Sequence, residues 1–214
     1  MVPGIIEVKL ATTLMAGWMA AASPVPVPSE VVALLLEAKA ATPVEVKLYD
    51  ENLRVDATVV LRRDGSTDPV TKKAVTKLFR CRVTNRSYPI KQRTLAMLAD
   101  IADRYDGKTI EFVSAYRVQR GESRTSPHRD ARAIDFRIRG VQLREIRDYL
   151  WRNYSEVGIG WYPSEQFIHM DSRPTLHDTA WTFLKGNNRY KPYWAELARR
   201  PESTRTVAAR RPGS

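Results

Sequence analysis

Only one cysteine, Cys81, occurs among the 214 residues, so no disulfide can form within the chain. Long hydrophobic runs are also missing: the most apolar stretch, residues 10–23, is too short to cross a membrane comfortably. No cysteine directly follows that stretch, which argues against a lipid-modified N-terminus, and no internal repeat is visible. These absences predict a monomeric globular domain with no covalent crosslink and no stable membrane span.

The N-terminal segment has features of a secretory signal. Residues 10–23 are uncharged and end in small residues at 20–22, a plausible cleavage site, although residues 1–9 carry one lysine and one glutamate and make an atypical start. We expect residues 1–22 to be a signal peptide, which would place the protein in the periplasm or cell envelope. An ordinary apolar N-terminal helix is the alternative.

The composition is that of a soluble protein with a core, since 43% of residues are hydrophobic and 28% are charged. The formal net charge of +11 is unusual and indicates an anionic partner: nucleic acid, a membrane surface or a cell-wall polymer. Charge alone does not choose among these. No recognisable nucleic-acid-binding module or interleaving of basic and aromatic residues is present, so no nucleic-acid partner is predicted.

Periodicity predicts an α+β fold with a small, mostly antiparallel sheet and helices packed on one face. Residues 23–43 are expected to form a linker and a short helix with Ser29 as its N-cap candidate, and residues 199–214 a basic disordered tail. Between them, residues 44–198 form the predicted domain. Its expected elements are a hairpin over 44–66, helices over 68–83, 90–107 and 141–154, and strands over 109–117, 131–139, 155–162 and 166–172.

Helical spacing also predicts which side chains of two helices face the core. In residues 68–83 the predicted face carries Val70, Ala74, Leu78 and Cys81. In residues 90–107 it carries Leu95, Leu98, Ile101 and Tyr105, and Gly107 is expected to cap the end.

The three histidines of the chain all lie between residues 128 and 177. Strand alternation places Asp135 on the face opposite Ile134 and Phe136, and places His169 and Asp171 on one face of the strand over 166–172. If these strands are neighbours, Asp135 and His169 meet on the open face of the sheet, and His128 can fold back over it from the preceding turn. Two imidazoles and a carboxylate suit a zinc site with one open position. Hydrogen-bonded strand or surface histidines are the alternative.

Three segments carry a resemblance to a known family. They are "SAYR" at 114–117, "SPHRDARAIDFRIRGVQL" at 126–143 and "VGIGWYPSEQFIHMD" at 157–171. Together they resemble the zinc D-alanyl-D-alanine carboxypeptidase and murein endopeptidase superfamily, closest to its murein endopeptidase K-like branch. The similarity extends over roughly residues 44 to 181.

By this resemblance, His128, Asp135 and His169 are zinc ligands, and the cofactor is Zn2+. Arg117 corresponds to the arginine that faces the metal pocket and orients or polarises the substrate carbonyl, with a salt-bridged structural arginine as the alternative. Ser126, a candidate substrate-binding residue, either hydrogen-bonds near the metal or caps the turn. The implied function is hydrolysis of peptide bonds in peptidoglycan stem peptides or cross-links, by an endopeptidase or a carboxypeptidase. A non-catalytic cell-wall-binding module of the same fold is the alternative, and the bond that is cleaved stays open.

The chain departs from the family pattern at two positions. Ala131 replaces a glycine, which strains the loop if that position has a positive φ. Gln166 stands where carboxypeptidase branches carry an acid, so the general base is not identified. Asp171 is a candidate for proton transfer or for orienting His169, with the second role preferred. His177, with a surface histidine as its alternative, and Glu165, next to Gln166, are the other candidates, and strand alternation argues against Glu165.

Overall fold

A mixed eight-stranded sheet organises the computed structural model, which describes residues 28–198. Its spatial order is β2-β1-β3-β4-β6-β5-β7-β8. The strands are β1 (Pro43–Asp50), β2 (Val55–Arg62), β3 (Ile110–Ser114), β4 (Ala133–Ile138), β5 (Val157–Tyr162), β6 (Phe167–Ser172), β7 (Thr179–Leu184) and β8 (Asn187–Tyr190). The helices are α1 (Ser29–Ala41), α2 (Pro69–Leu78), α3 (Gln92–Arg104), α4 (Leu143–Asn153) and α5 (Tyr193–Leu197). The predicted α+β class is confirmed.

The prediction of a mostly antiparallel sheet was wrong, because the sheet is mixed. β1 and β3 run parallel, and so do β5 and β7. The chain leaves the β1–β2 hairpin, passes through α2 and α3, and returns as β3 on the free side of β1; such a crossover brings a strand back in the same direction. β7 and β8 were not predicted at all.

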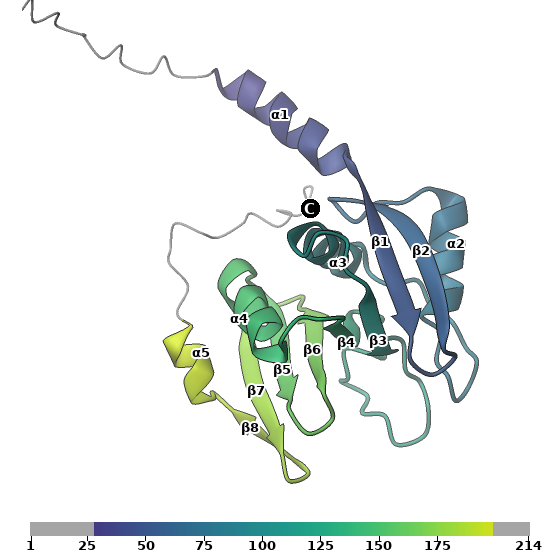
Figure 1. Cartoon of the computed structure of the whole chain (residues 1–214), viewed down its shortest axis with the longest axis vertical. Helices are drawn as coiled ribbons and strands as arrows, with labels where there is room; N and C mark the ends of the chain where they lie inside the picture. Colours follow the sequence, from purple (N-terminus) through teal and green to yellow (C-terminus); the bar gives the residue numbers. More distant parts are fainter. Residues whose placement is uncertain (1–27, 199–214) are drawn as a thin grey trace, which may run out of the picture.

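Helices α2, α3 and α4 pack on the core face of this sheet (Figure 1). The amphipathic pattern of α3 is confirmed, since Leu95, Leu98 and Ile101 are buried, and Tyr105 is buried just beyond the helix. Gly107 adopts a positive φ of 64°, and its N–H donates to the carbonyl of Ala102, which ends the helix as expected.

The core-facing side of α2 was predicted only in part. Asp68 caps the helix, because its side chain accepts hydrogen bonds from the backbone N–H groups of Val70 and Thr71. Val70 itself is 78% exposed, and Val75 is the residue that α2 buries. The helix ends at Leu78, so the helical spacing no longer holds at Cys81, although that residue is buried.

Helix α1 lies outside the core and projects away from the rest of the fold (Figure 1). None of its residues is buried. The predicted Ser29 cap was wrong: the residue at the cap position is Pro28, and no side chain caps the first turn. A helix that buries no residue gains little from tertiary packing, and within the described chain the first buried residues are those of the β1–β2 hairpin.

The two faces of the central strands carry different chemistry. Ile134 and Phe136 of β4, and Ile168 and Met170 of β6, are buried in the helix-covered core, as alternation predicts. The opposite face carries Asp135, His169 and Asp171. The central strands therefore place all three polar side chains on one side of the sheet.

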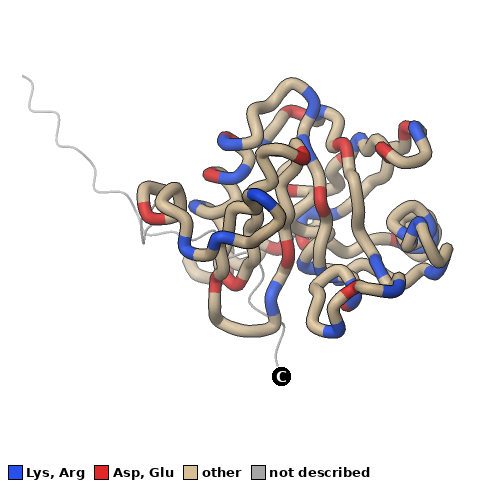
Figure 2. The backbone as a smooth tube through the Cα atoms, turned by 90° about the horizontal axis from the view of Figure 1, so that it is seen from below, with Lys and Arg blue, Asp and Glu red and all other residues tan. Residues whose placement is uncertain are grey.

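Charged residues are spread over the fold. Figure 2 shows lysines and arginines on several sides of the described chain with acidic residues among them, rather than one continuous basic face. Within residues 28–198, no helix has the length and apolar character needed to cross a membrane. The predicted signal peptide and basic tail lie outside the described residues, and the domain limits stay predictions.

Candidate metal centre

The register between β4 and β6 sets Asp135 directly opposite His169. The Oδ1 atom of Asp135 lies 2.8 Å from Nδ1 of His169. Such a pairing requires the two strands to be neighbours in the sheet, although 34 residues separate them in the chain. The expected meeting of these two side chains therefore occurs.

His128 reaches the same point from the turn that leads into β4. Its Nε2 atom lies 3.2 Å from Oδ2 of Asp135 and 3.1 Å from Nδ1 of His169. The turn is closed by backbone hydrogen bonds from Arg129 to Ser126 and from Ala131 to His128. The prediction that His128 folds back over the strand is confirmed.

One ligand atom from each of His128, Asp135 and His169 can be chosen so that all three lie within 4.8 Å of one another. The three residues are only 1%, 3% and 5% exposed. Two imidazole nitrogens and one carboxylate oxygen form a donor set that zinc takes in catalytic sites. The geometry fits a metal ion, and the role of these residues as ligands stays a prediction.

Each imidazole has its second nitrogen engaged by a fixed partner. Nδ1 of His128 lies 2.5 Å from the carbonyl oxygen of Ala115, which leaves Nε2 for the cluster. Nε2 of His169 lies 3.1 Å from Oδ2 of Asp171, which leaves Nδ1 for the cluster. Hydrogen bonds of this kind fix the ring orientation and the tautomer of metal-binding histidines.

The electrostatics of the cluster favour a cation. Burial alone would raise the pKa of Asp135, but the imidazoles of His128 and His169 lower it well below its usual range. Burial alone would lower the pKa of His169, but its hydrogen bonds to Asp135 and Asp171 raise it to about 9. The pocket thus keeps its carboxylates ionised and stabilises positive charge between them.

Arg117 lies at the edge of the cluster. Its Nη1 atom is 3.2 Å from Oδ2 of Asp135, and its Nε atom is 3.0 Å from Oε2 of Glu122. The strand register shifts between Phe112 and Ser114, and the chain beyond β3 carries Arg117 toward the turn that holds His128. Glu122, whose side chain is 11% exposed, was not identified from the sequence, since only the folded loop brings it to Arg117.

Comparison with known proteins bears directly on this arrangement. The family model described as peptidoglycan L,D-endopeptidase MepK matches residues 38–177, which include every candidate residue named so far. The chain belongs to the MepK family. The resemblance seen in the sequence is therefore confirmed.

Two curated relatives give the extent of the similarity. Peptidoglycan L,D-endopeptidase MepK of Escherichia coli (strain K12) is 31% identical over 80 residues, covering 33% of this chain and 43% of the relative. The probable peptidoglycan L,D-endopeptidase MepK of Haemophilus influenzae is 40% identical over 58 residues, covering 27% of this chain and 31% of the relative. The matched stretches thus span less than half the length of these relatives, and no solved structure matches significantly.

The turn between Ser126 and Arg132 contains Ala131, which replaces a glycine of the family pattern. Ala131 is fully buried and has a φ of 53°, in the left-handed region that favours glycine. Its backbone is fixed on both sides, since its N–H donates to His128 and its carbonyl accepts from Lys91. The predicted strain is therefore present at this position.

Other residues considered from the sequence lie farther out. Glu165 and Gln166 are exposed in the turn before β6, and Gln166 has a φ of 59°, so neither belongs to the strand that holds His169. His177 is exposed in the segment between β6 and β7. The backbone carbonyl of Ser126 accepts a hydrogen bond from Arg129 in the turn, and the role of the Ser126 side chain stays a prediction.

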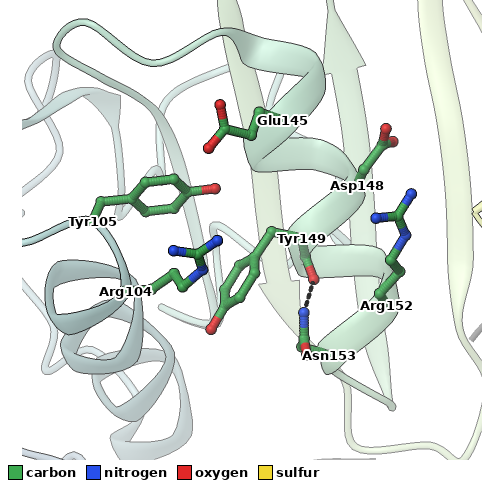
Figure 3. Close-up of a pocket in the computed structure, with 7 residues that line it drawn as sticks. All are labelled: Arg104, Tyr105, Glu145, Asp148, Tyr149, Arg152 and Asn153. Carbon is green, nitrogen blue, oxygen red and sulfur yellow. Dashed lines mark hydrogen bonds between the residues drawn. The ribbon is translucent and has the colours of Figure 1, made fainter. Parts of the chain in front are cut away.

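A separate hollow of about 450 Å³ lies between the end of α3 and α4 (Figure 3). The guanidinium of Arg104 lies 5.5 Å from the ring centroids of both Tyr105 and Tyr149. The hydroxyl of Tyr149 donates to Asp100 at 2.7 Å. These contacts belong to the packing of two helices on the core side of the sheet, whereas the cluster lies on the other side.

Proposed function

We propose that this chain is a zinc-dependent peptidase that hydrolyses peptide bonds in peptidoglycan. The single observation that carries the proposal is the convergence of His128, Asp135 and His169 on one buried point, in a chain of the MepK family. A zinc ion bound there would supply Lewis-acid chemistry, polarising a carbonyl and activating water.

The chain's own residues would prepare the site for that chemistry. Asp171 holds the ring of His169 through Nε2, so that Nδ1 faces the cluster, and the carbonyl of Ala115 does the same for His128. Arg117 projects a fixed positive charge beside Asp135, where its planar guanidinium can hold the oxygen of a peptide carbonyl as negative charge develops on it.

The kind of bond that the chain would cleave is inferred from the names of its relatives. The curated proteins that this chain resembles carry the name L,D-endopeptidase, which favours an L,D bond within a cross-link over removal of a terminal residue. The net charge of +11 supports an anionic wall polymer as the partner. Action on such a polymer requires export, which the signal-like residues 1–22 would provide.

Metal analysis of the purified protein is the first test. We expect about one zinc per chain, and loss of zinc from His128→Ala and His169→Ala, because two remaining ligands rarely hold zinc tightly. His177→Ala is the matched control, since it removes an exposed imidazole outside the cluster and should leave the zinc content unchanged.

Digestion of purified peptidoglycan, with products identified by mass spectrometry, is the second test. The zinc-loaded protein should release fragments that result from cleavage of an L,D bond, and His169→Ala should release none. Zinc binding without any cleavage would instead identify a non-catalytic wall-binding module. Absence of metal from protein reconstituted with zinc would refute the zinc-dependent peptidase.

A further inference from the structure

The face of strand β5 that points toward the cluster carries two glycines. Val157, Ile159 and Trp161 point to the helix side, so the cluster side carries Gly158, Gly160 and Tyr162. A methyl group on Gly160 would lie 2.5–2.7 Å from three atoms of the Trp181 indole. The indole of β7 therefore lies across the bare backbone of β5.

Trp181 reaches the cluster because Gly160 leaves this space. Gly160 pairs with His169 on one side and with Trp181 on the other. The ring centroids of Trp181 and His169 are 5.0 Å apart, and Trp181 is 6% exposed. The indole thus forms one wall beside a candidate metal ligand, on the side away from Arg117.

Tyr162 is fixed in orientation by its neighbours on both adjacent strands. Its ring stacks on Phe167 of β6, with centroids 4.4 Å apart, and on Phe183 of β7, with centroids 5.0 Å apart. The interplanar angles are 18° and 24°, so the three rings form a nearly parallel stack. A ring held in this way cannot swing out of the sheet face without losing both contacts.

The hydroxyl of Tyr162 has a free proton to donate. Nε1 of Trp181 lies 3.2 Å from the phenolic oxygen, and an indole N–H only donates, so this oxygen is the acceptor. Within residues 28–198, no acceptor for the tyrosine's own O–H is seen. Burial raises the pKa of Tyr162, against the lowering effect of the Trp181 hydrogen bond, so the hydroxyl stays protonated at neutral pH.

Trp181 connects the hydroxyl of Tyr162 to the cluster. Nε1 of Trp181 lies over Gly160, next to His169, and the tyrosine oxygen is one hydrogen bond away from that nitrogen. The charges of Asp135 and Arg117 also act on Tyr162. Arg117 approaches the cluster from the loop beyond β3, whereas Tyr162 approaches from β5, so the two flank it on opposite sides.

We propose that Tyr162 binds the substrate directly, by donating a hydrogen bond to a carbonyl oxygen of the peptide on the side of the cluster opposite Arg117. Trp181 is the positioning residue for that hydroxyl. The peptide is then held between a guanidinium and a phenol, one on each side of the metal ligands. This inference rests on the peptidase function proposed above.

Tyr162→Phe removes the hydroxyl and keeps the stacked ring. We expect kcat/KM for peptidoglycan cleavage to fall between about tenfold and a hundredfold, as for a lost positioning or oxyanion contact, with zinc content and thermal midpoint unchanged. Tyr190→Phe is the matched control, because it removes a hydroxyl from a ring that is 61% exposed. A change of less than twofold in Tyr162→Phe, or loss of zinc from it, overturns the proposal.

Trp181→Phe keeps a ring beside His169 but removes the indole N–H. It should lower kcat/KM by a smaller factor than Tyr162→Phe, and the double variant should be no worse than Tyr162→Phe alone, because both changes act through one hydroxyl. Losses that multiply in the double variant would show that Trp181 acts independently, which overturns its positioning role.

A binding measurement distinguishes failure of this inference from failure of the proposed function. Calorimetric titration of the zinc-loaded protein with a soluble cross-linked stem-peptide fragment should give weaker binding for Tyr162→Phe than for wild type. If wild type binds the fragment but does not cleave peptidoglycan, and Tyr162→Phe weakens binding, the peptidase function fails and the contact stands. Equal binding by both proteins together with equal cleavage would refute the contact and leave the peptidase function intact.

Discussion

Gly160→Ala is a direct test of how the sheet accommodates Trp181. The added methyl would lie 2.5 Å from Cε2, 2.6 Å from Cζ2 and 2.7 Å from Nε1 of the indole, all closer than carbon atoms approach in folded proteins. The indole is large, rigid and 6% exposed, so it cannot turn aside as the end of a flexible side chain would. Either the indole of Trp181 moves away from Gly160 or strands β5 and β7 separate.

The expected loss of stability follows from three contributions. Overpacking of this kind costs about 1–3 kcal/mol. Loss of the hydrogen bond from Trp181 to Tyr162 adds about 1 kcal/mol. Replacement of a glycine within a strand by alanine offsets roughly 0.5–1 kcal/mol of this total. The net destabilisation is about 1–3 kcal/mol, which lowers the thermal midpoint by roughly 2–10 °C for a domain of this size.

A double-mutant cycle with Trp181→Phe makes the assay specific. Phenylalanine lacks the indole nitrogen and the fused ring that the methyl group meets, so Gly160→Ala should be nearly neutral in that background. Thermal unfolding of the four zinc-loaded proteins, followed by circular dichroism, gives the coupling energy, which we expect to be about 1–2 kcal/mol. Additive effects would refute the inference that Gly160 exists to admit the indole.

Four further predictions concern the cluster. Arg117→Lys should retain zinc but lower the cleavage rate by about 10²–10³, because lysine keeps the charge but not the planar fork; an unchanged rate would assign Arg117 to structure. Glu122→Gln should keep zinc and lower the rate by a smaller factor, about tenfold, through a less ordered Arg117, and full activity would exclude that dependence. Asp171→Asn should weaken zinc affinity about 10- to 100-fold while the pH–rate profile keeps its shape, whereas loss of one limb of the profile with zinc retained would indicate proton transfer. Metal-free protein should lose up to about 3 kcal/mol of stability as the pH rises from 6.5 through 9, because the fold raises the pKa of His169 from 6.5 to about 9 and so favours its protonated form. Urea unfolding at pH 6 and at pH 9.5 measures this loss, and equal stability at the two pH values would contradict it.

Short-range patterns predicted the parts of the fold that depend on them. Alternation predicted that Asp135 and His169 would meet on one face if their strands were neighbours, and the observed register places them opposite each other. Helical spacing identified the buried side of α3, because that helix has a complete apolar stripe. It was right only in part for α2, because that helix has no complete apolar stripe: it buries Val75, whereas Val70 of the predicted face is exposed.

Long-range contacts could not be predicted in the same way. β7 was missed although its Trp181 borders His169, because nothing in residues 179–184 indicates which strand they pair with. Glycine within a strand is typical of close backbone approach, but no such approach was predicted at Gly160, since the identity of the approaching ring depends on the parallel pairing of β5 with β7. Glu122 likewise meets Arg117 only once the loop is folded.

The Ala131 departure illustrates why a motif residue can change without loss of the site. Alanine in the left-handed region costs about 1–2 kcal/mol relative to glycine, and the observed φ of 53° places Ala131 there. Its methyl group is fully buried, however, and a buried methyl contributes about 0.8 kcal/mol. The second effect offsets part of the first, and the backbone hydrogen bonds to His128 and Lys91 hold the turn in place. His128 therefore lies against Asp135 with alanine at position 131.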